Sequence, residues 1–388
     1  RGCKHEGKVS SRLISYSALA EGFKKSNDEQ MFTPGFSLYR ALVCGRISNG
    51  MGTNLEYATY DDSVNYVIND GVLTGYNGKR SVLDIPEGVT QIADNCFKNR
   101  TSITSVNMPE SLISIGQSAF EGCTNLRSVD FNDALESIGA YAFRYCSRLV
   151  SAVFGSKLET IGSRCFYNCY SLCSVLLPEI IESIAYCAFN GCTSLESIVI
   201  PDSVTRIGDY AFSGCTSLAS VTLSKSLEYL GVQAFGYCKS LTSIEIPRSL
   251  NNTYNLDGMY NHIGGPFTGC SSLTDVTFEE GTTKIAACLF DSCGGIVNIV
   301  IPDTVTVIGK QAFYDCDNLE SVIISDSVDE IDGSAFAGCT SLESIVMPNS
   351  VTWVGGYAFS NCTSLSSVTL SKSLEYLGVQ AFGYCKSL

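Results

Sequence analysis

Residues 192–214 read CTSLESIVIPDSVTRIGDYAFSG, and this stretch decides the fold. The segment from Ser197 to Ile200 is predicted to be a short strand with Ile198 and Ile200 facing inward, because successive side chains of a strand point to opposite faces. Pro201 ends the strand, since proline cannot donate a hydrogen bond to a strand ladder. Gly208 is interpreted as the residue that allows a tight bend after a second short extended segment. Together these features predict one compact coil.

The same coil recurs along most of the chain. A phenylalanine returns every 23 residues, with one longer interval, at Phe97, Phe120, Phe143, Phe166, Phe189, Phe212, Phe235, Phe267, Phe290, Phe313, Phe336, Phe359 and Phe382. A single coil cannot bury its own apolar side, so neighbouring coils must stack around a continuous core. The sequence therefore predicts a β-rich solenoid of about thirteen 23-residue repeats.

The repeated phrase Ser-Val-Thr-x-Ile-Gly-x-x-Ala-Phe-x-Gly-Cys-Thr-Ser-Leu-x-Ser-Val-x-Ile-Pro resembles the BspA-like, or treponemal, class of leucine-rich repeats. The resemblance covers residues 81–388 and implies a right-handed, leucine-rich-repeat-like coil. Members of this family are typically surface proteins of bacteria and of some parasitic protists. Several are implicated in attachment to host cells and matrix proteins. Because a fold does not by itself fix a function, this implication is an expectation for the present chain.

The chain divides into three predicted parts. Residues 1–62 show no repeat and receive no role. Residues 63–80 are predicted to form an N-terminal capping hairpin, because Asn69-Asp70-Gly71 is a turn signal between two extended segments. Residues 81–388 form the predicted solenoid, which carries an insertion around 248–265.

A duplication is visible inside the repeat array. Residues 216–241 recur at 363–388 with one change, Ala219 against Ser366. The last repeat therefore stops in mid-coil at Leu388, which would leave an uncapped strand edge. We expect the natural protein to continue beyond this point.

The charge of the chain limits its partners. The formal net charge is −14, and Lys and Arg form no cluster in the sequence. Nucleic acid and anionic membranes both attract clustered basic residues, so they are poor partners for this chain. No run of eighteen apolar residues predicts a membrane-spanning helix. We therefore expect a protein or glycan partner.

The cysteines are predicted to be structural. Twelve of the nineteen follow a core phenylalanine by three residues, so their side chains should point inward in parallel. A tetrahedral zinc site needs four ligands that converge on one point, which a linear stack does not provide. These thiols should behave as small buried hydrophobic groups. Pairing of Cys3 with Cys44 in an oxidising compartment, and of Cys165 with Cys187, remain open alternatives.

Catalytic motifs are missing from the sequence. It has two histidines, His5 and His262, and it lacks a phosphate-binding Gly-x-x-x-x-Gly-Lys loop, a His-Glu-x-x-His motif and a nucleophile elbow. We therefore expect neither enzymatic activity nor a cofactor or metal.

Two columns of outward-facing strand residues flank the buried strand centre. One, the serine column, is nearly all serine, whereas the other, the variable column, changes from coil to coil. The variable column contains two apolar triplets, which are candidate contact surfaces: Val153, Leu176 and Val199, then Val300, Ile323 and Val346. Plain β-propensity is the alternative explanation, because β-branched residues suit a strand on either face.

The insertion is a second candidate site. Its Tyr254, Tyr260 and His262 stand among asparagines in a segment that interrupts an otherwise regular array. Loops on rigid scaffolds often carry function. Solenoids also tolerate insertions without function, and both interpretations stay open.

The leading hypothesis is a non-enzymatic adhesion module, secreted or at the cell surface, which recognises a host or matrix protein or a glycan. The alternative is a structural component of a larger assembly, which would bind another component of that assembly. Such a scaffold would be intracellular. A secretion signal and an anchor in the full-length gene would favour adhesion over a scaffold.

Overall fold

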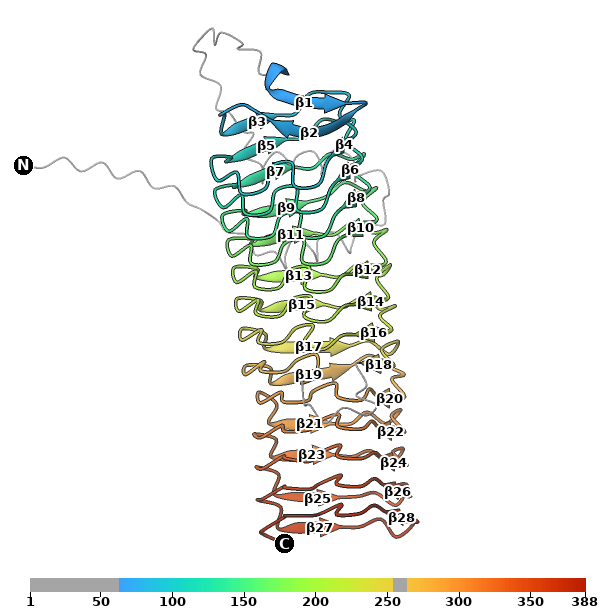
Figure 1. Ribbon diagram of the computed structural model, residues 1–388. Coiled ribbons are helices and arrows are strands. Elements are labelled where there is room, and N and C mark those ends of the chain that lie inside the picture. Colours follow the sequence, from blue (N-terminus) through green and yellow to red (C-terminus); the bar gives the residue numbers. More distant parts are fainter. Residues whose placement is uncertain (1–62, 254–263) are drawn as a thin grey trace, which may run out of the picture. The chain divides into compact units, whose positions relative to one another are not determined.

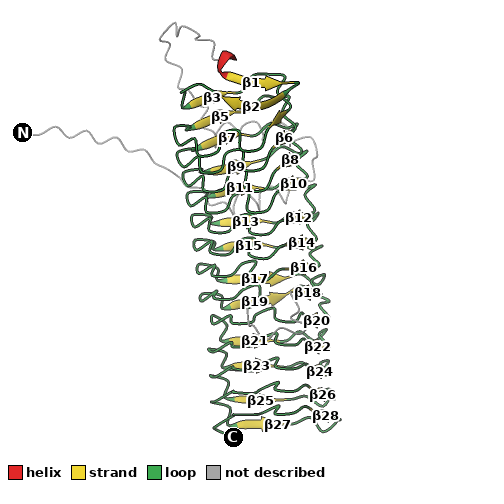
Figure 2. Cartoon of the chain, viewed as in Figure 1, coloured by secondary structure: helices red, strands yellow, loops and turns green. Residues whose placement is uncertain are grey.

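The computed structural model describes residues 63–253 and 264–388, which form a stack of coils (Figure 1). Each coil adds strands to two columns, and turns connect them (Figure 2). Within the described residues the one helical element is the 3-10 turn η2, Ser63–Asn65. The prediction of a β-solenoid with parallel strands and a 23-residue repeat is confirmed.

The first column holds the longer strands. These are β3 (Val82–Asp84), β5 (Ser105–Asn107), β7 (Ser128–Asp130), β9 (Ser151–Val153), β11 (Ser174–Leu176), β13 (Ser197–Val199), β15 (Ser220–Thr222), β17 (Ser243–Ile246), β19 (Asp275–Phe278), β21 (Asn298–Val300), β23 (Ser321–Ile323), β25 (Ser344–Val346) and β27 (Ser367–Thr369). Paired neighbours run parallel and in register, so that Ile198 lies opposite Val221 and Val199 opposite Thr222. The strand centre, such as Ile198, is buried, which leaves the two flanking residues to face outward.

The second column holds two-residue strands. These are β4 (Gln91–Ile92), β6 (Ser114–Ile115), β8 (Ser137–Ile138), β10 (Thr160–Ile161), β12 (Ser183–Ile184), β14 (Arg206–Ile207), β16 (Tyr229–Leu230), β18 (Asn252–Thr253), β20 (Lys284–Ile285), β22 (Val307–Ile308), β24 (Glu330–Ile331), β26 (Trp353–Val354) and β28 (Tyr376–Leu377). Thr253 of β18 pairs with Leu230 of β16. The coil with the insertion therefore keeps its short strand in register.

An antiparallel hairpin precedes the first coil. Strand β1 (Tyr66–Asn69) pairs with β2 (Val72–Tyr76), and Asp70 and Gly71 form the turn with positive φ. Strand β2 then pairs in parallel with β4. The ring of Tyr76 lies 4.8 Å from that of Tyr66 and 6.2 Å from that of Phe97, measured between ring centroids. The hairpin thus lies directly on the aromatic core of the first coil.

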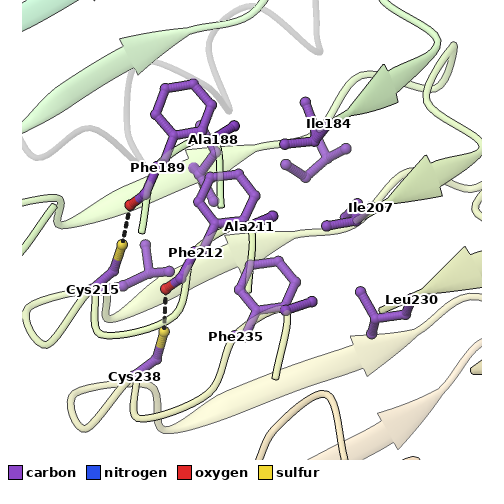
Figure 3. Close-up of a cluster of buried hydrophobic side chains, with 14 of the residues drawn as sticks. Ile184, Ala188, Phe189, Ile207, Ala211, Phe212, Cys215, Leu230, Phe235 and Cys238 are labelled. Atoms are coloured by element: carbon purple, nitrogen blue, oxygen red, sulfur yellow. Dashed lines mark hydrogen bonds between the residues drawn. The ribbon is translucent and has the colours of Figure 1, made fainter. Parts of the chain in front are cut away.

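The core is a ladder of stacked phenylalanine rings. Phe189, Phe212 and Phe235 are fully buried, and their ring centroids are 5.3 and 5.1 Å apart, with planes 5° and 3° from parallel (Figure 3). Each ring therefore packs on the rings of the coils before and after it. Dispersion and apolar burial accumulate along the whole stack, because no coil is isolated from its neighbours.

The buried cysteines also connect neighbouring coils. The thiol of Cys215 donates a hydrogen bond to the backbone oxygen of Phe189, and Cys238 donates in the same way to Phe212 (Figure 3). Among the described cysteines all are free thiols. The alternative pairing of Cys165 with Cys187 is therefore wrong: Cys165 points into the core, whereas Cys187 lies in a turn and lines a surface cavity. Cys3 and Cys44 lie outside the described residues.

The turn that contains each core phenylalanine is tied to the next coil by backbone hydrogen bonds. The amides of Tyr210, Phe212 and Gly214 donate to backbone oxygens of the following coil at 2.7–2.8 Å. Tyr210 and Gly214 both have positive φ, and the two equivalent positions are left-handed in most coils. Glycine suits this region and occupies the second position in some coils, but non-glycine residues such as asparagine and tyrosine occupy it in others, and the first position is left-handed with tyrosine, serine, glutamine and arginine.

Gly208 stands at the start of a bend, as interpreted, because its backbone oxygen accepts the amide of Ala211 at 3.3 Å, but a special backbone angle is not the reason for the glycine. Its φ lies outside the left-handed region, and a Cβ atom there would lie 3.0 Å from the backbone nitrogen of Tyr186 in the preceding coil. The equivalent Gly231 is tighter still, at 2.5 Å from the nitrogen of Asp209. These glycines are required because two backbones approach closely between coils.

Candidate functional site

The two apolar triplets lie in consecutive coils of the variable column. Val153 pairs with Leu176, and Val300 pairs with Ile323. The side chains of Val300, Ile323 and Val346 are 60–62% exposed. In the other triplet Val199 is 57% and Leu176 38% exposed, while Val153 is half-buried. The structure therefore places both triplets at the surface, and the second presents the larger apolar face.

Polar residues separate and border the triplets. Thr222 follows Val199 in register, and Glu245 pairs with Thr277 before the second triplet begins. On the neighbouring serine column, the hydroxyl groups of Ser105 and Ser128 lie 3.1 Å apart. These hydroxyl groups form hydrogen bonds between coils. A partner that covers a triplet thus meets aliphatic groups beside a strip of hydroxyl groups.

The charged residues of the serine and variable columns share one sign. In the first column of strands, which contains these positions, they are Asp84, Asp130, Glu245 and Asp275. No lysine or arginine occurs in the described strands of this first column. The outer face of the first column is therefore acidic wherever it is charged, in keeping with the net charge of −14.

The predicted loop residues Tyr254, Tyr260 and His262 lie outside the described residues. Within the described ranges, no group of three or more His, Cys, Asp or Glu side chains has the arrangement of a metal site. Across that same part of the chain, no helix has the length and apolarity needed to cross a membrane.

A cavity that the sequence reasoning missed lies on the turn side of the stack. Its volume is about 450 Å³. Two arginines and four tyrosines from successive coils line it, together with Cys187 and Asn190: Tyr141, Arg144, Arg164, Tyr167, Tyr186 and Tyr210. We call it the arginine–tyrosine cavity. Most of these residues occupy the position two before or one after a core phenylalanine, where the residue type changes from coil to coil.

Arg164 is held between two phenol groups. One terminal nitrogen donates to the Tyr141 hydroxyl at 2.9 Å, and the other donates to the Tyr186 hydroxyl at 3.3 Å. The guanidinium carbon lies 4.6 Å from the ring centroid of Tyr186. Partial burial is the largest single effect and lowers the pKa of the Arg164 guanidinium, but the hydrogen bond to Tyr141 and the electrostatic effects of Tyr141, Tyr186 and Cys187 together outweigh it, so the pKa is raised. Arg164 is thus a pre-oriented cation.

Arg144 lies beside it in a different environment. Its guanidinium carbon is 4.4 Å from the ring centroid of Tyr145 and 5.4 Å from that of Tyr167, and a terminal nitrogen is 3.4 Å from Glu121. Burial raises the pKa of Glu121, but hydrogen bonds from Lys98 and Ser118 and the nearby cations outweigh it, so the pKa is lowered. Arg144 is therefore partly neutralised, whereas Arg164 makes no ion pair among the described residues.

One family model identifies the repeat type. The family described as "BspA type Leucine rich repeat region (6 copies)" matches residues 75–195, 159–256 and 265–388. No curated protein sequence matches the chain.

Several solved structures are similar. A leucine-rich repeat protein from Bacteroides ovatus is 28% identical, with a TM-score of 0.66, and the match covers 84% of this chain and 91% of that one. A leucine-rich cell surface protein from Faecalibacterium prausnitzii is 25% identical over 81% of this chain and 96% of that one, with a TM-score of 0.41. A T. pallidum leucine-rich repeat protein is 25% identical over 58% and 82%, with a TM-score of 0.31. The first of these supports the fold.

Proposed function

The chain belongs to the BspA-type leucine-rich repeat family, and from this premise we propose that it is a non-enzymatic, cell-surface protein that binds a protein partner through its strand columns. One observation carries the proposal: two triplets of aliphatic side chains lie in consecutive coils on the outer face of the stacked strands, and two members of each triplet pair in register. A cluster of exposed apolar side chains favours association with a partner, because the free energy falls when apolar surface is removed from water.

The chemistry of the triplets favours a protein over a glycan. Valine, isoleucine and leucine offer neither hydrogen-bonding groups nor aromatic rings to a sugar. A protein interface combines an apolar centre with a polar rim. The triplet Val300, Ile323 and Val346, bordered by the serine column, has this composition.

The charge of the columns favours a different protein over a second copy of this chain. Two copies that meet through these columns would bring Glu245 and Asp275 towards other acidic groups. Like charges at an interface oppose association. The partner we propose therefore carries apolar side chains flanked by lysine or arginine.

Replacement of one triplet by threonine tests the proposal. In the variant Val300→Thr, Ile323→Thr, Val346→Thr, each residue stays β-branched, and threonine already occupies this column at Thr222 and Thr369. Burial of one exposed aliphatic side chain contributes on the order of 1–2 kcal/mol. We expect binding to host cells and to purified matrix proteins to weaken by about tenfold or more.

The matched control changes three exposed valines outside the triplets: Val64→Thr, Val150→Thr and Val379→Thr. This control should bind like the wild type. Equal binding by wild type and the triplet variant, with both folded, would contradict the proposed surface. If sedimentation shows that the wild type forms a dimer and the triplet variant does not, the result would instead support the scaffold alternative.

A further inference from the structure

The arginine–tyrosine cavity has a local charge opposite to that of the whole chain. Arg164 makes no ion pair among the described residues, and Arg144 shares Glu121 with Lys98, whose ammonium lies 2.9 Å from the same carboxylate. Asp209, whose charge adds to burial in raising the pKa of the Cys187 thiol in the cavity lining, accepts hydrogen bonds from the Val232 amide and the Tyr229 hydroxyl of the next coil. The cavity therefore keeps an excess positive charge in a chain of net charge −14.

Its lining is suited to a small polar ligand. The phenol groups can donate and accept hydrogen bonds, and Asn190 adds an amide. A guanidinium matches the geometry of a carboxylate and binds it through two parallel hydrogen bonds. A volume of about 450 Å³ lies within the range of small-molecule sites. These features together select an anion that also carries several hydroxyl groups.

The charge count separates one anion class from another. A polyanion such as nucleic acid needs many cations along its backbone. Here Arg164 is the cation without a carboxylate partner among the described residues, and the acidic chain around it repels a long polyanion. A ligand with a single carboxylate satisfies Arg164 without that repulsion.

We propose that the arginine–tyrosine cavity binds an acidic sugar residue, whose carboxylate pairs with Arg164 and whose hydroxyl groups bond to the surrounding tyrosines. The residue is either free or the end of a glycan. The site lies in the turns, apart from the strand columns that carry the proposed protein-binding surface. The two proposals therefore stand or fail separately.

Calorimetric titration of the full chain with glucuronate, and with glucose as the matched neutral sugar, tests this site. The two sugars share one ring and differ in the carboxylate. The test variant is Arg164→Gln, because Gln233, Gln311 and Gln380 occupy the equivalent position with the same left-handed backbone. The control is Arg148→Gln, which removes one exposed positive charge from the coil of Arg144 without altering the cavity.

We expect glucuronate to bind the wild type and the control alike, glucose to bind at least tenfold more weakly, and Arg164→Gln to lose about tenfold or more in affinity for glucuronate. An oligosaccharide with a terminal glucuronate distinguishes a glycan end from a free sugar: tighter binding than the monosaccharide identifies the glycan. Three results would overturn the proposal: no glucuronate binding, equal affinity for glucose, or equal affinity for inorganic sulfate. Equal affinity for sulfate would mean that the tyrosine hydroxyl groups do not contribute to recognition of the sugar. Unchanged protein binding by Arg164→Gln keeps the result separate from the proposed function.

Discussion

The thiol of Cys238 lies 3.4 Å from the backbone oxygen of Phe212 in the preceding coil and donates a hydrogen bond to it. That oxygen also accepts the amide of Cys215. The bond repeats along the stack, from Cys123 to Phe97 at the first interface through Cys385 to Phe359 at the last, except that the Cys293 thiol donates to the backbone oxygen of Cys270 at 3.9 Å. The cysteine column therefore combines apolar packing with a donor that no other small apolar residue supplies.

Thiol labelling should separate buried from exposed cysteines in one experiment. Cys173 is exposed, whereas Cys192, Cys215 and Cys238 are fully buried. Burial raises the pKa of the Cys215 thiol to about 12, so little reactive thiolate forms at neutral pH. We expect an alkylating reagent to modify Cys173 in the native protein and the others only after denaturation. If mass spectrometry finds the buried thiols modified as fast as Cys173, these cysteines are accessible to the reagent in the native protein and the prediction is wrong.

Alkaline pH should destabilise the solenoid. Burial raises the pKa of the Cys215 and Cys362 thiols to about 12 in the folded chain, whereas a free thiol has a pKa of about 8.5. The folded state thus binds the thiol protons more tightly than the unfolded state. The stability that the protonated thiols contribute is therefore fully present below about pH 8.5 and is lost as the pH rises towards 12. Each thiol should remove about 1.4 kcal/mol of unfolding free energy per pH unit in this window.

The measurement is chemical denaturation under reducing conditions at pH 8 and pH 10. A variant with Cys192, Cys215 and Cys238 changed to alanine should show a shallower loss of unfolding free energy between these values. A slope that does not depend on the cysteines would assign the alkaline effect to other groups.

Loss of one ring should break the aromatic ladder. Phe212→Ala removes a fully buried side chain whose ring packs on Phe189 and Phe235. We expect a loss of about 3–5 kcal/mol in unfolding free energy, because the rigid neighbours cannot close the cavity. The exposed Tyr170→Ala serves as the control and should change stability by roughly 0.5 kcal/mol or less. An unchanged melting temperature for Phe212→Ala would refute the ladder.

The close approach between coils gives a fourth prediction. In Gly231→Ala the new Cβ would lie 2.5 Å from the backbone nitrogen of Asp209, so the two coils must separate. We expect a loss on the order of 1–3 kcal/mol. Gly294→Ala is the control, because no atom lies within 4 Å of its Cβ. Equal thermal stability of the two variants would mean that the coil spacing is not set by this glycine.

The sequence predicts the core well because every coil buries side chains at the same repeat positions. Phe212 and Cys215 must face inward wherever the period places them, so their burial follows from spacing alone. The need for a glycine at position 208 does not follow from the spacing, because it depends on the backbone of Tyr186, which is distant in sequence. Spacing shows which residues recur, but it does not show which backbones meet.

The cavity escaped prediction because its residues share no single type. Tyr141, Arg164 and Tyr210 occupy one position of the turn, and Arg144 and Tyr167 occupy another. In other coils these positions hold many residue types, most of them small or polar, so the columns resemble solvated turns. The available signal was the run of arginine and tyrosine over successive coils, which alignment of the repeats against each other reveals.

The duplicated block has a genetic consequence. Residues 216–241 and 363–388 occupy equivalent places in their coils and contribute β15 and β16 in one case and β27 and β28 in the other. A crossover between the DNA of these two copies would excise the segment between them and rejoin the chain without a shift in register. The shortened protein would keep the triplet that begins at Val153 and lose the triplet that begins at Val300. One recombination event would therefore leave a chain with one apolar triplet in place of two.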